Sequence, residues 1–301
     1  MSLQDKAMLA TLTIKKWSGK GRDVVARDNL CLQEGAENKA VGVSKKLVFG
    51  KLFDELRELD TKARARFYAL TLPWQDEGSR ILAAKIYQAT LLEFATFQDE
   101  FLCMADKVIA AMAAEKLEAQ RRLGGLYKED DYPADSDIRG RYSFDFSVMP
   151  IPSGNDFRVT LGDGEREKLQ AEVETRVRAA EYAAKRDIYD RVAECVGRIS
   201  ESLPKFNPDA KGLARGTFRD TLVTNLQEIV RGLDGLNFDD DPRLTALQAS
   251  ITAKLLKHTA EELRESATAR KEVAESAEDI LATMAGYTGG MVVMPAVSKA
   301  A

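Results

Sequence analysis

The run from Gly164 to Leu203 constrains the fold more than any other stretch of this chain. It holds about forty residues without a proline, and an unbroken helix of that length extends about 60 Å. Acidic residues in the run precede basic residues by four positions, a spacing that stabilises a solvated helix. These pairs are Glu172–Arg176, Glu174–Arg178, Glu181–Lys185, Asp187–Arg191 and Glu194–Arg198. We therefore predict one long helix that Asp163 caps and Pro204 ends.

A second run of similar length, from Ser79 to Gly124, also predicts a long helix. Its apolar residues recur at gaps of three and four, which is typical of a coiled-coil-like seam. The apolar residues of the run from Gly164 to Leu203 recur about every 3.8 residues, more slowly than the 3.5 of a heptad. We therefore expect that helix to pack on neighbours and not to form a long regular zipper.

Between the two runs, the residues from Arg141 to Val148 alternate between apolar and polar side chains, as in a half-buried strand. An apolar return over 157–161 predicts a β-hairpin spanning residues 141–161. A two-stranded hairpin is marginal in water, so its apolar face must be covered, and the segment around Ile14 is one candidate third strand. The predicted fold is mainly α: two long helices form an elongated antiparallel arm with the small β-hairpin between them, packed on a helical base.

Composition changes and helix signals divide the chain into four predicted parts. Residues 1–78 form an N-terminal basic segment and helix, and residues 79–203 form the arm. Residues 213–286 form a C-terminal helical base, in which Asp241 before Pro242 and a capping box at Thr259 mark helix starts. Residues 287–301 form a flexible tail.

The residue types exclude several chemistries. His258 is the only histidine, which excludes zinc motifs with two histidines, and no glycine-rich loop has the P-loop pattern. The acidic runs 129–131 and 239–241 could hold Mg²⁺, but acids before a helix also suit the helix dipole, which we favour. We expect no catalytic residue, no cofactor and no metal. Three scattered cysteines without a CxxC pair and no apolar run of membrane-spanning length predict a cytoplasmic protein.

The N-terminal region is the part of the sequence best suited to nucleic acid. Residues 1–70 carry 14 Lys and Arg against 9 Asp and Glu. Cations that can pair with phosphates surround an aromatic ring that can stack on a base. These candidate residues are Lys15, Lys16, Trp17, Lys20 and Arg22, and Lys45, Lys46, Lys62, Arg64 and Arg66 could extend the set. The alternative interpretation is an ordinary solvated charged surface.

Aromatic residues of the predicted hairpin are candidates for binding a protein partner. They are Tyr142, Phe144, Phe146 and Phe157. The alternative interpretation is that they form the hydrophobic core under the hairpin.

Several short stretches resemble the family known as domain of unknown function 3150, which occurs in phages and integrative elements. The matching stretches are Thr71 to Trp74 with Gly78 and Arg80, Tyr132-Pro133, Phe144 to Pro152, Asp156 to Val159, Phe218 to Asp220 with Asn225, and Ile280-Leu281 with Met284. They cover residues 10–287. The genes of that family commonly neighbour a MoxR-type AAA+ ATPase and a von Willebrand factor A-type protein, and the family has no established catalytic residues.

From these patterns we expect a non-enzymatic helical assembly or adaptor protein of a phage or mobile element. The resemblance implies a partner in a MoxR-type AAA+ remodelling system, located in the host cytoplasm if a phage encodes the chain. A homo-oligomer is also compatible with the long helices. The alternative function is a DNA-binding accessory protein in phage recombination or replication.

Overall fold

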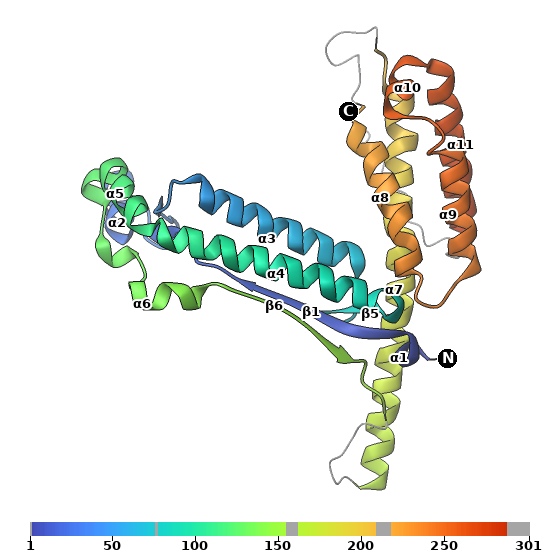
Figure 1. Ribbon diagram of the computed structural model, residues 1–301, viewed down its shortest axis with the longest axis horizontal. Coiled ribbons are helices and arrows are strands. Elements are labelled where there is room, and N and C mark those ends of the chain that lie inside the picture. Colours follow the sequence, from blue (N-terminus) through green and yellow to red (C-terminus); the bar gives the residue numbers. More distant parts are fainter. Residues whose placement is uncertain (1, 76–77, 155–161, 209–217, 288–301) are drawn as a thin grey trace. The chain divides into compact units, whose positions relative to one another are not determined.

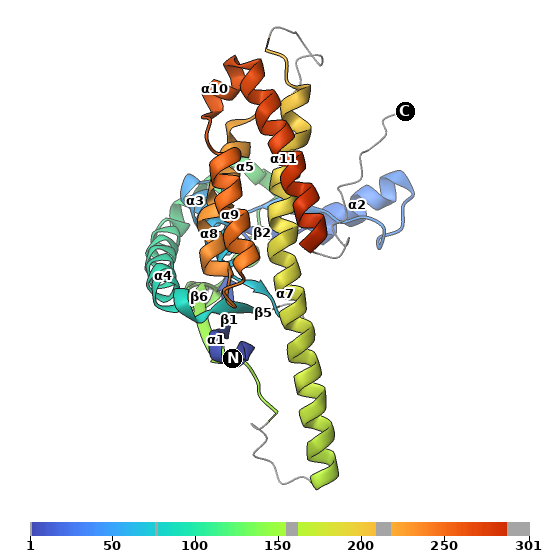
Figure 2. The same ribbon diagram turned by 90° about the vertical axis from the view of Figure 1, so that its right-hand side faces the viewer.

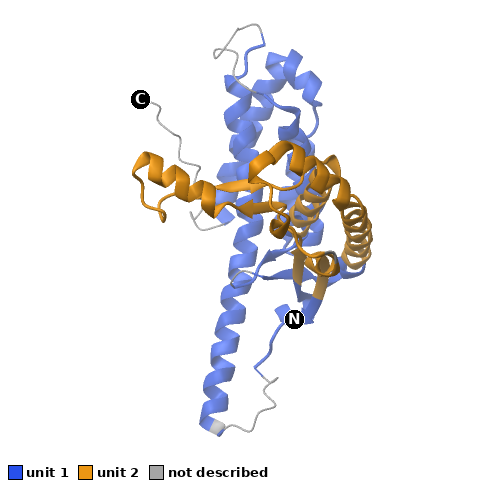
Figure 3. Cartoon of the chain, turned by 90° about the vertical axis from the view of Figure 1, so that its left-hand side faces the viewer, with its two compact units in different colours: residues 1–10, 68–88, 148–301 blue, residues 11–67, 89–147 orange. Residues whose placement is uncertain are grey.

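The computed structural model describes residues 2–75, 78–154, 162–208 and 218–287. The fold is mainly helical, with 70% helix and 11% strand, as predicted. Contacts between Cα atoms divide the chain into two compact units (Figure 3). Unit 1 contains residues 1–10, 68–88 and 148–301, and unit 2 contains residues 11–67 and 89–147.

Unit 1 is built on one long helix, α7 (Asp163–Lys205). This confirms the long helix predicted from the sequence. Gly162, and not Asp163, is the N-cap residue, and the helix continues through Pro204 to Lys205. Four of its ion pairs match the predicted spacing of four residues: Glu172–Arg176, Glu181–Lys185, Asp187–Arg191 and Glu194–Arg198.

The C-terminal helices of unit 1 pack on α7. They are α8 (Asp220–Leu236), α9 (Pro242–Lys254), α10 (Ala260–Glu265) and α11 (Ala267–Tyr287). Figure 2 shows α11 lying along α7, and the two helices share many contacts. One apolar core joins them, with Val196, Leu226 and Ile251 fully enclosed. Burying such side chains contributes about 1.5–3 kcal/mol each, which holds the bundle together.

The predicted starts of two of these helices are confirmed. Asp241 accepts a hydrogen bond from the backbone N–H of Arg243 at 2.9 Å, with Pro242 as the first residue of α9. Thr259 and Glu262 form the predicted capping box of α10.

The second long helix differs from the prediction, because Ser79 does not cap a helix. Ser79–Ala83 is strand β5, which pairs antiparallel with β4 (Leu72–Pro73), and Leu72 lies opposite Ile81. A 3₁₀ turn (Ala84–Ile86) leads into α4 (Tyr87–Ala110), and Ala111 separates α4 from α5 (Met112–Leu123). The strand forms because the backbone of residues 80 and 81 finds partners on β4. The antiparallel pairing of α4 with α7 stays a prediction.

Unit 2 places helices over aromatic strand residues. Its secondary structure comprises α2 (Val24–Glu34), α3 (Lys51–Leu70), α4, α5, α6 (Asp135–Ile138), β1 (Ala7–Lys15), β2 (Lys20–Arg22), β3 (Ser44–Lys46) and β6 (Ser143–Pro150), some of which continue into unit 1. Figure 1 shows α3 beside α4, and an ion pair between Arg66 and Glu93 joins them. The rings of Phe94 on α4 and Phe146 on β6 stack with their centroids 4.6 Å apart.

The strand predicted between the two long runs is confirmed as β6. In the four-stranded sheet, of order β4-β5-β1-β6, it neighbours β1, which contains Ile14. The segment around Ile14 is therefore the neighbouring strand, as expected. The return of the predicted hairpin, including Phe157, lies outside the described residues.

A carboxylate from α5 holds the start of α3. Glu115 accepts hydrogen bonds from the backbone N–H groups of Phe49 at 2.7 Å and Gly50 at 3.0 Å. These donors precede the first turn of α3, where a negative charge is favoured. A Cβ atom at position 50 would lie 2.0 Å from the Glu115 Oε1 atom, so a larger residue there would displace this carboxylate from its position.

Candidate nucleic-acid interface

The basic N-terminal residues divide between the surface and the interior of unit 2. Lys15, at the end of β1, is exposed. Lys16 forms an ion pair with Asp60, whose other carboxylate oxygen accepts a hydrogen bond from Arg64 at 2.7 Å. Burial lowers the pKa of Lys16, and the charges of Arg64 and Arg57 lower it further. Lys16 is thus committed to a contact inside the unit.

Trp17 is part of the core and not a surface platform. Its side chain is buried, and its ring packs edge-on against Phe53 and tilted against Tyr132, with centroids 6.3 and 5.9 Å away. The Tyr132 hydroxyl donates a hydrogen bond to the carbonyl oxygen of Leu47, which ties this cluster to the chain after β3. In this arrangement the indole has no open face on which a base could stack.

Lys20 and Arg22 lie on β2, which pairs antiparallel with β3. Lys20 is opposite Lys46, Gly21 opposite Lys45, and Arg22 opposite Ser44. Successive side chains of a strand point to opposite faces. One face of this two-stranded ribbon therefore carries Lys20, Arg22, Ser44 and Lys46, all exposed, while the other carries Gly21 and the buried Lys45.

The buried face of the ribbon is an ion cluster. The Lys45 ammonium lies 2.6 Å from Asp131 Oδ2 and 3.3 Å from Asp23 Oδ2, and donates to the carbonyl oxygen of Leu126 at 2.6 Å. Asp23 also accepts from the backbone N–H of Ala26 at 2.9 Å and so caps α2. The cluster fixes the ribbon to the start of α2 and to the loop before α6.

The cluster shifts the pKa values of Lys45 and Asp23 in the direction of their charged forms. Burial alone would lower the pKa of Lys45, but its hydrogen bonds and charge interactions with Asp131 and Asp23 raise it above the ordinary lysine value. The hydrogen bond from the Ala26 N–H lowers the pKa of Asp23, and Lys45 lowers it further. Both groups therefore stay ionised around neutral pH.

A half-exposed aromatic ring, that of Phe49, lies beside the ribbon and has no signal in the sequence that marks it as part of the site. The centroid of the Phe49 ring lies 5.7 Å from the Lys46 ammonium and 4.8 Å from the guanidinium carbon of Arg122. Arg122 is 73 positions away in the sequence, so only the folded unit brings it to Phe49. Lys46 itself was already a possible extension of the basic set.

The aromatic residues of β6 and Tyr142, which directly precedes the strand, are part of the core. Tyr142 and Phe144 are buried, and Phe146 is half-buried against Phe94. Burial raises the pKa of Tyr142 to about 12. The alternative interpretation, hydrophobic core, therefore describes these three residues, and they present no open aromatic surface to a partner.

The acidic runs have structural partners. Asp239 pairs with Lys185 at 2.7 Å, Asp240 pairs with Lys85 at 3.4 Å, and Asp241 caps α9. Glu129 pairs with Lys116 at 2.8 Å. Within the described ranges, no group of three or more His, Cys, Asp or Glu side chains is arranged to hold a metal ion.

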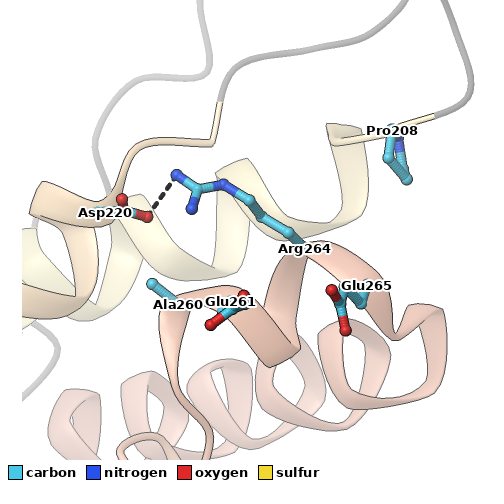
Figure 4. Close-up of a pocket in the computed structure, with 6 residues that line it drawn as sticks. All are labelled: Pro208, Asp220, Ala260, Glu261, Arg264 and Glu265. Carbon is cyan, nitrogen blue, oxygen red and sulfur yellow. Dashed lines mark ion pairs between the residues drawn. The ribbon is translucent and has the colours of Figure 1, made fainter.

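An open pocket in unit 1 is lined mainly by charged residues (Figure 4). The lining residues are Pro208, Asp220, Ala260, Glu261, Arg264 and Glu265. Arg264 forms an ion pair with Asp220, and its guanidinium lies 5.8 Å from the ring centroid of Phe218. The one cation of the lining is thus already neutralised. His258 lies 3.5 Å from Glu262 and 3.8 Å from Glu272, on the same helical region, and is not in this lining.

The comparisons with known proteins give no relative for this chain: no family model, no curated protein and no solved structure matches it. The resemblance to domain of unknown function 3150 therefore stays a prediction. None of the helices in the described part of the chain combines the length and hydrophobicity that a membrane span needs.

Proposed function

We propose that the chain is a non-enzymatic helical adaptor that binds protein partners. The observation that carries this proposal is an apolar face on α2. Val24, Val25 and Leu32 are 52%, 55% and 85% exposed. Residues seven or eight positions apart share one side of a helix, so the three side chains form a common surface. Grouped apolar side chains in water mark a site where another protein can bind.

The exposed start of α7 supports the same proposal. From Gly164 to Lys168 every residue is exposed, and Val177 is the first fully buried residue of the helix. The Glu172–Arg176 ion pair lies within this part. A solvated helix that carries its own charge pairs can project without a core of its own. We also propose, as the sequence suggests, that α4 and α7 act as an elongated antiparallel arm.

The proposed partners follow from the family resemblance. They are a MoxR-type AAA+ ATPase and a von Willebrand factor A-type protein encoded beside the chain in a phage or mobile element. In this proposal the chain links partners of an ATP-driven remodelling system in the host cytoplasm, as a single chain or a homo-oligomer, and contributes no reaction of its own.

The test is co-purification of the full chain with each neighbouring protein, using a variant of the α2 face. The double variant Val25→Gln and Leu32→Gln replaces two apolar side chains with polar ones. Both positions remain exposed on the helix. If Val25 and Leu32 become buried against the partner, each contributes more than about 1 kcal/mol to the free energy of binding. The double variant is therefore expected to bind at least tenfold more weakly.

The matched control is Leu92→Gln on α4, which changes a residue that is 70% exposed and lies away from α2. This variant is expected to bind as the unchanged chain does. Lack of association with both neighbouring proteins would contradict the adaptor function. Equal binding by the α2 variant and the control would contradict the role of α2.

A further inference from the structure

The exposed face of the β2–β3 ribbon gathers positive charge at a fixed spacing. Lys20 and Arg22 are two residues apart on β2, which places them about 6.6 Å apart along the strand. Lys46 lies directly across from Lys20 on β3. Three cations therefore project from one small, rigid surface. We call the exposed side chains of Lys20, Arg22 and Lys46 the open face.

The cations of the open face lack acidic partners, as do several other exposed lysines in the described part of unit 2. Within the described residues, Lys20, Arg22 and Lys46 form no ion pair. Most arginines of the unit do have a carboxylate partner: Arg27, Arg57, Arg64, Arg66, Arg121, Arg122 and Arg139. The unit supplies carboxylates to these arginines and none to the three cations of the open face, which sets the open face apart by its density of unpaired charge and not by unpaired charge alone.

The pairing of Lys20 with Lys46 costs stability in the free protein. Like charges directly opposite each other on an antiparallel pair repel. A glutamate at position 46 would be equally exposed. It would form an ion pair with Lys20 across the ribbon in place of the like-charge pair. Two lysines facing each other suit a surface that meets an external anion.

The spacing of the cations along the strand indicates which kind of anion would fit the open face. Alternate residues on a strand repeat at a distance close to that between successive phosphates of a nucleic-acid strand, and a two-stranded ribbon is narrow enough to enter a major groove. Lys15 is exposed at the end of β1, and Arg122 lies beside Phe49 next to Lys46. The open face consists of lysine and arginine side chains without a ring that could stack on a base, so we expect its main contacts to be with phosphates, which carry no base sequence.

We propose that the open face binds the phosphate backbone of nucleic acid without sequence preference. This activity goes beyond the adaptor function and does not depend on it. It also replaces the set of residues expected from the sequence: Lys20 and Arg22 remain, Lys46 joins them, and Lys16 and Trp17 leave because they are held inside unit 2.

The test is the affinity of the full chain for a labelled mixed-sequence oligonucleotide, single-stranded and as a duplex, measured at several salt concentrations. Three phosphate contacts predict that affinity falls about 20-fold for the single strand and 40-fold for the duplex between about 50 and 200 mM salt. The two forms of the probe show which strand geometry the ribbon prefers.

The decisive variant is Lys46→Glu, which reverses one charge of the open face. It is expected to bind about tenfold more weakly and to lower the salt slope by about one. Arg22→Gln provides a second variant with a smaller change and the same direction. The matched control is Lys107→Glu, the same reversal at an exposed position of α4 outside the candidate set, which is expected to bind as the unchanged chain does. Thermal melting establishes that each variant is folded.

Three results would overturn the proposal. One is affinity that does not change with salt. Another is equal loss of affinity in Lys46→Glu and Lys107→Glu, which would mean that only net charge matters. The third is tighter binding to polyglutamate than to either oligonucleotide, which would identify an acidic polypeptide as the partner.

Discussion

The two faces of the β2–β3 ribbon carry adjacent lysines in opposite settings. Lys45 is buried between Asp23 and Asp131, while its neighbour Lys46 is exposed and faces Lys20. The pleat of the strand alone separates them. The comparison shows that a basic stretch does not act as one patch: one lysine fixes the ribbon in place and the next stays exposed to solvent.

The largest predicted effect follows from removing the buried charge. Lys45→Met leaves two carboxylates close together without their cation, inside the cluster that anchors the ribbon. We expect the free energy of unfolding to fall by about 3 kcal/mol, as for a buried ion pair that loses one partner. Denaturant unfolding measures this change.

Lys46→Met is the matched control, because it removes the same charge one position later. We expect its free energy of unfolding to stay within about 0.5 kcal/mol of the unchanged chain, as for an ordinary surface substitution. Similar losses for the two variants would show that the two faces do not differ as described.

The pH dependence of stability sharpens the same comparison. The pKa of Asp23 is lowered in the folded state, so its contribution is complete above the ordinary aspartate pKa and is lost as pH falls through the lowered value. The pKa of Lys45 is raised, so its contribution is complete below the ordinary lysine pKa and is lost as pH rises through the raised value.

Unfolding measured over a pH series is therefore expected to show a stability difference between the unchanged chain and Lys45→Met that is constant at neutral pH. The difference should shrink toward both extremes. A difference that stays constant into strong acid would contradict the pairing of Lys45 with its two aspartates.

The smallest predicted effect concerns the open face. Lys46→Glu replaces the like-charge pair of Lys46 and Lys20 with an ion pair across the ribbon. It should therefore raise the free energy of unfolding by a few tenths of a kcal/mol. The same change should weaken nucleic-acid binding. Parallel melting and binding measurements test this opposite response. A loss of stability together with the loss of binding would mean that Lys46 has a structural role.

Local patterns predicted much of the helical fold from the sequence. The charge pairs and missing prolines of the Gly164–Leu203 run predicted α7, and Asp241 before Pro242 predicted the start of α9. These signals act within one or two turns, so they need no knowledge of the tertiary fold. Strand β5 was missed because it lies between β4 and β1 in the sheet, and β1 comes from a segment far earlier in the sequence that the periodicity of β5 does not reveal.

The candidate site was predicted only in part, for a related reason. Composition identified Lys20 and Arg22, but it could not separate them from Lys16, which pairs with Asp60, 44 positions away. The burial of Trp17 depends on Phe53 and Tyr132, which come from different elements. Contacts between distant segments decide which cations remain free, and the sequence does not contain them explicitly.

Lysine acetylation followed by mass spectrometry tests the contrast between the two faces most directly. The full chain is labelled with and without an oligonucleotide. The account predicts that Lys20 and Lys46 react readily in the free protein and become protected when nucleic acid is bound, while Lys45 reacts poorly in both states. Ready labelling of Lys45 in the folded protein, or equal labelling of Lys20 and Lys46 with and without the oligonucleotide, would contradict it.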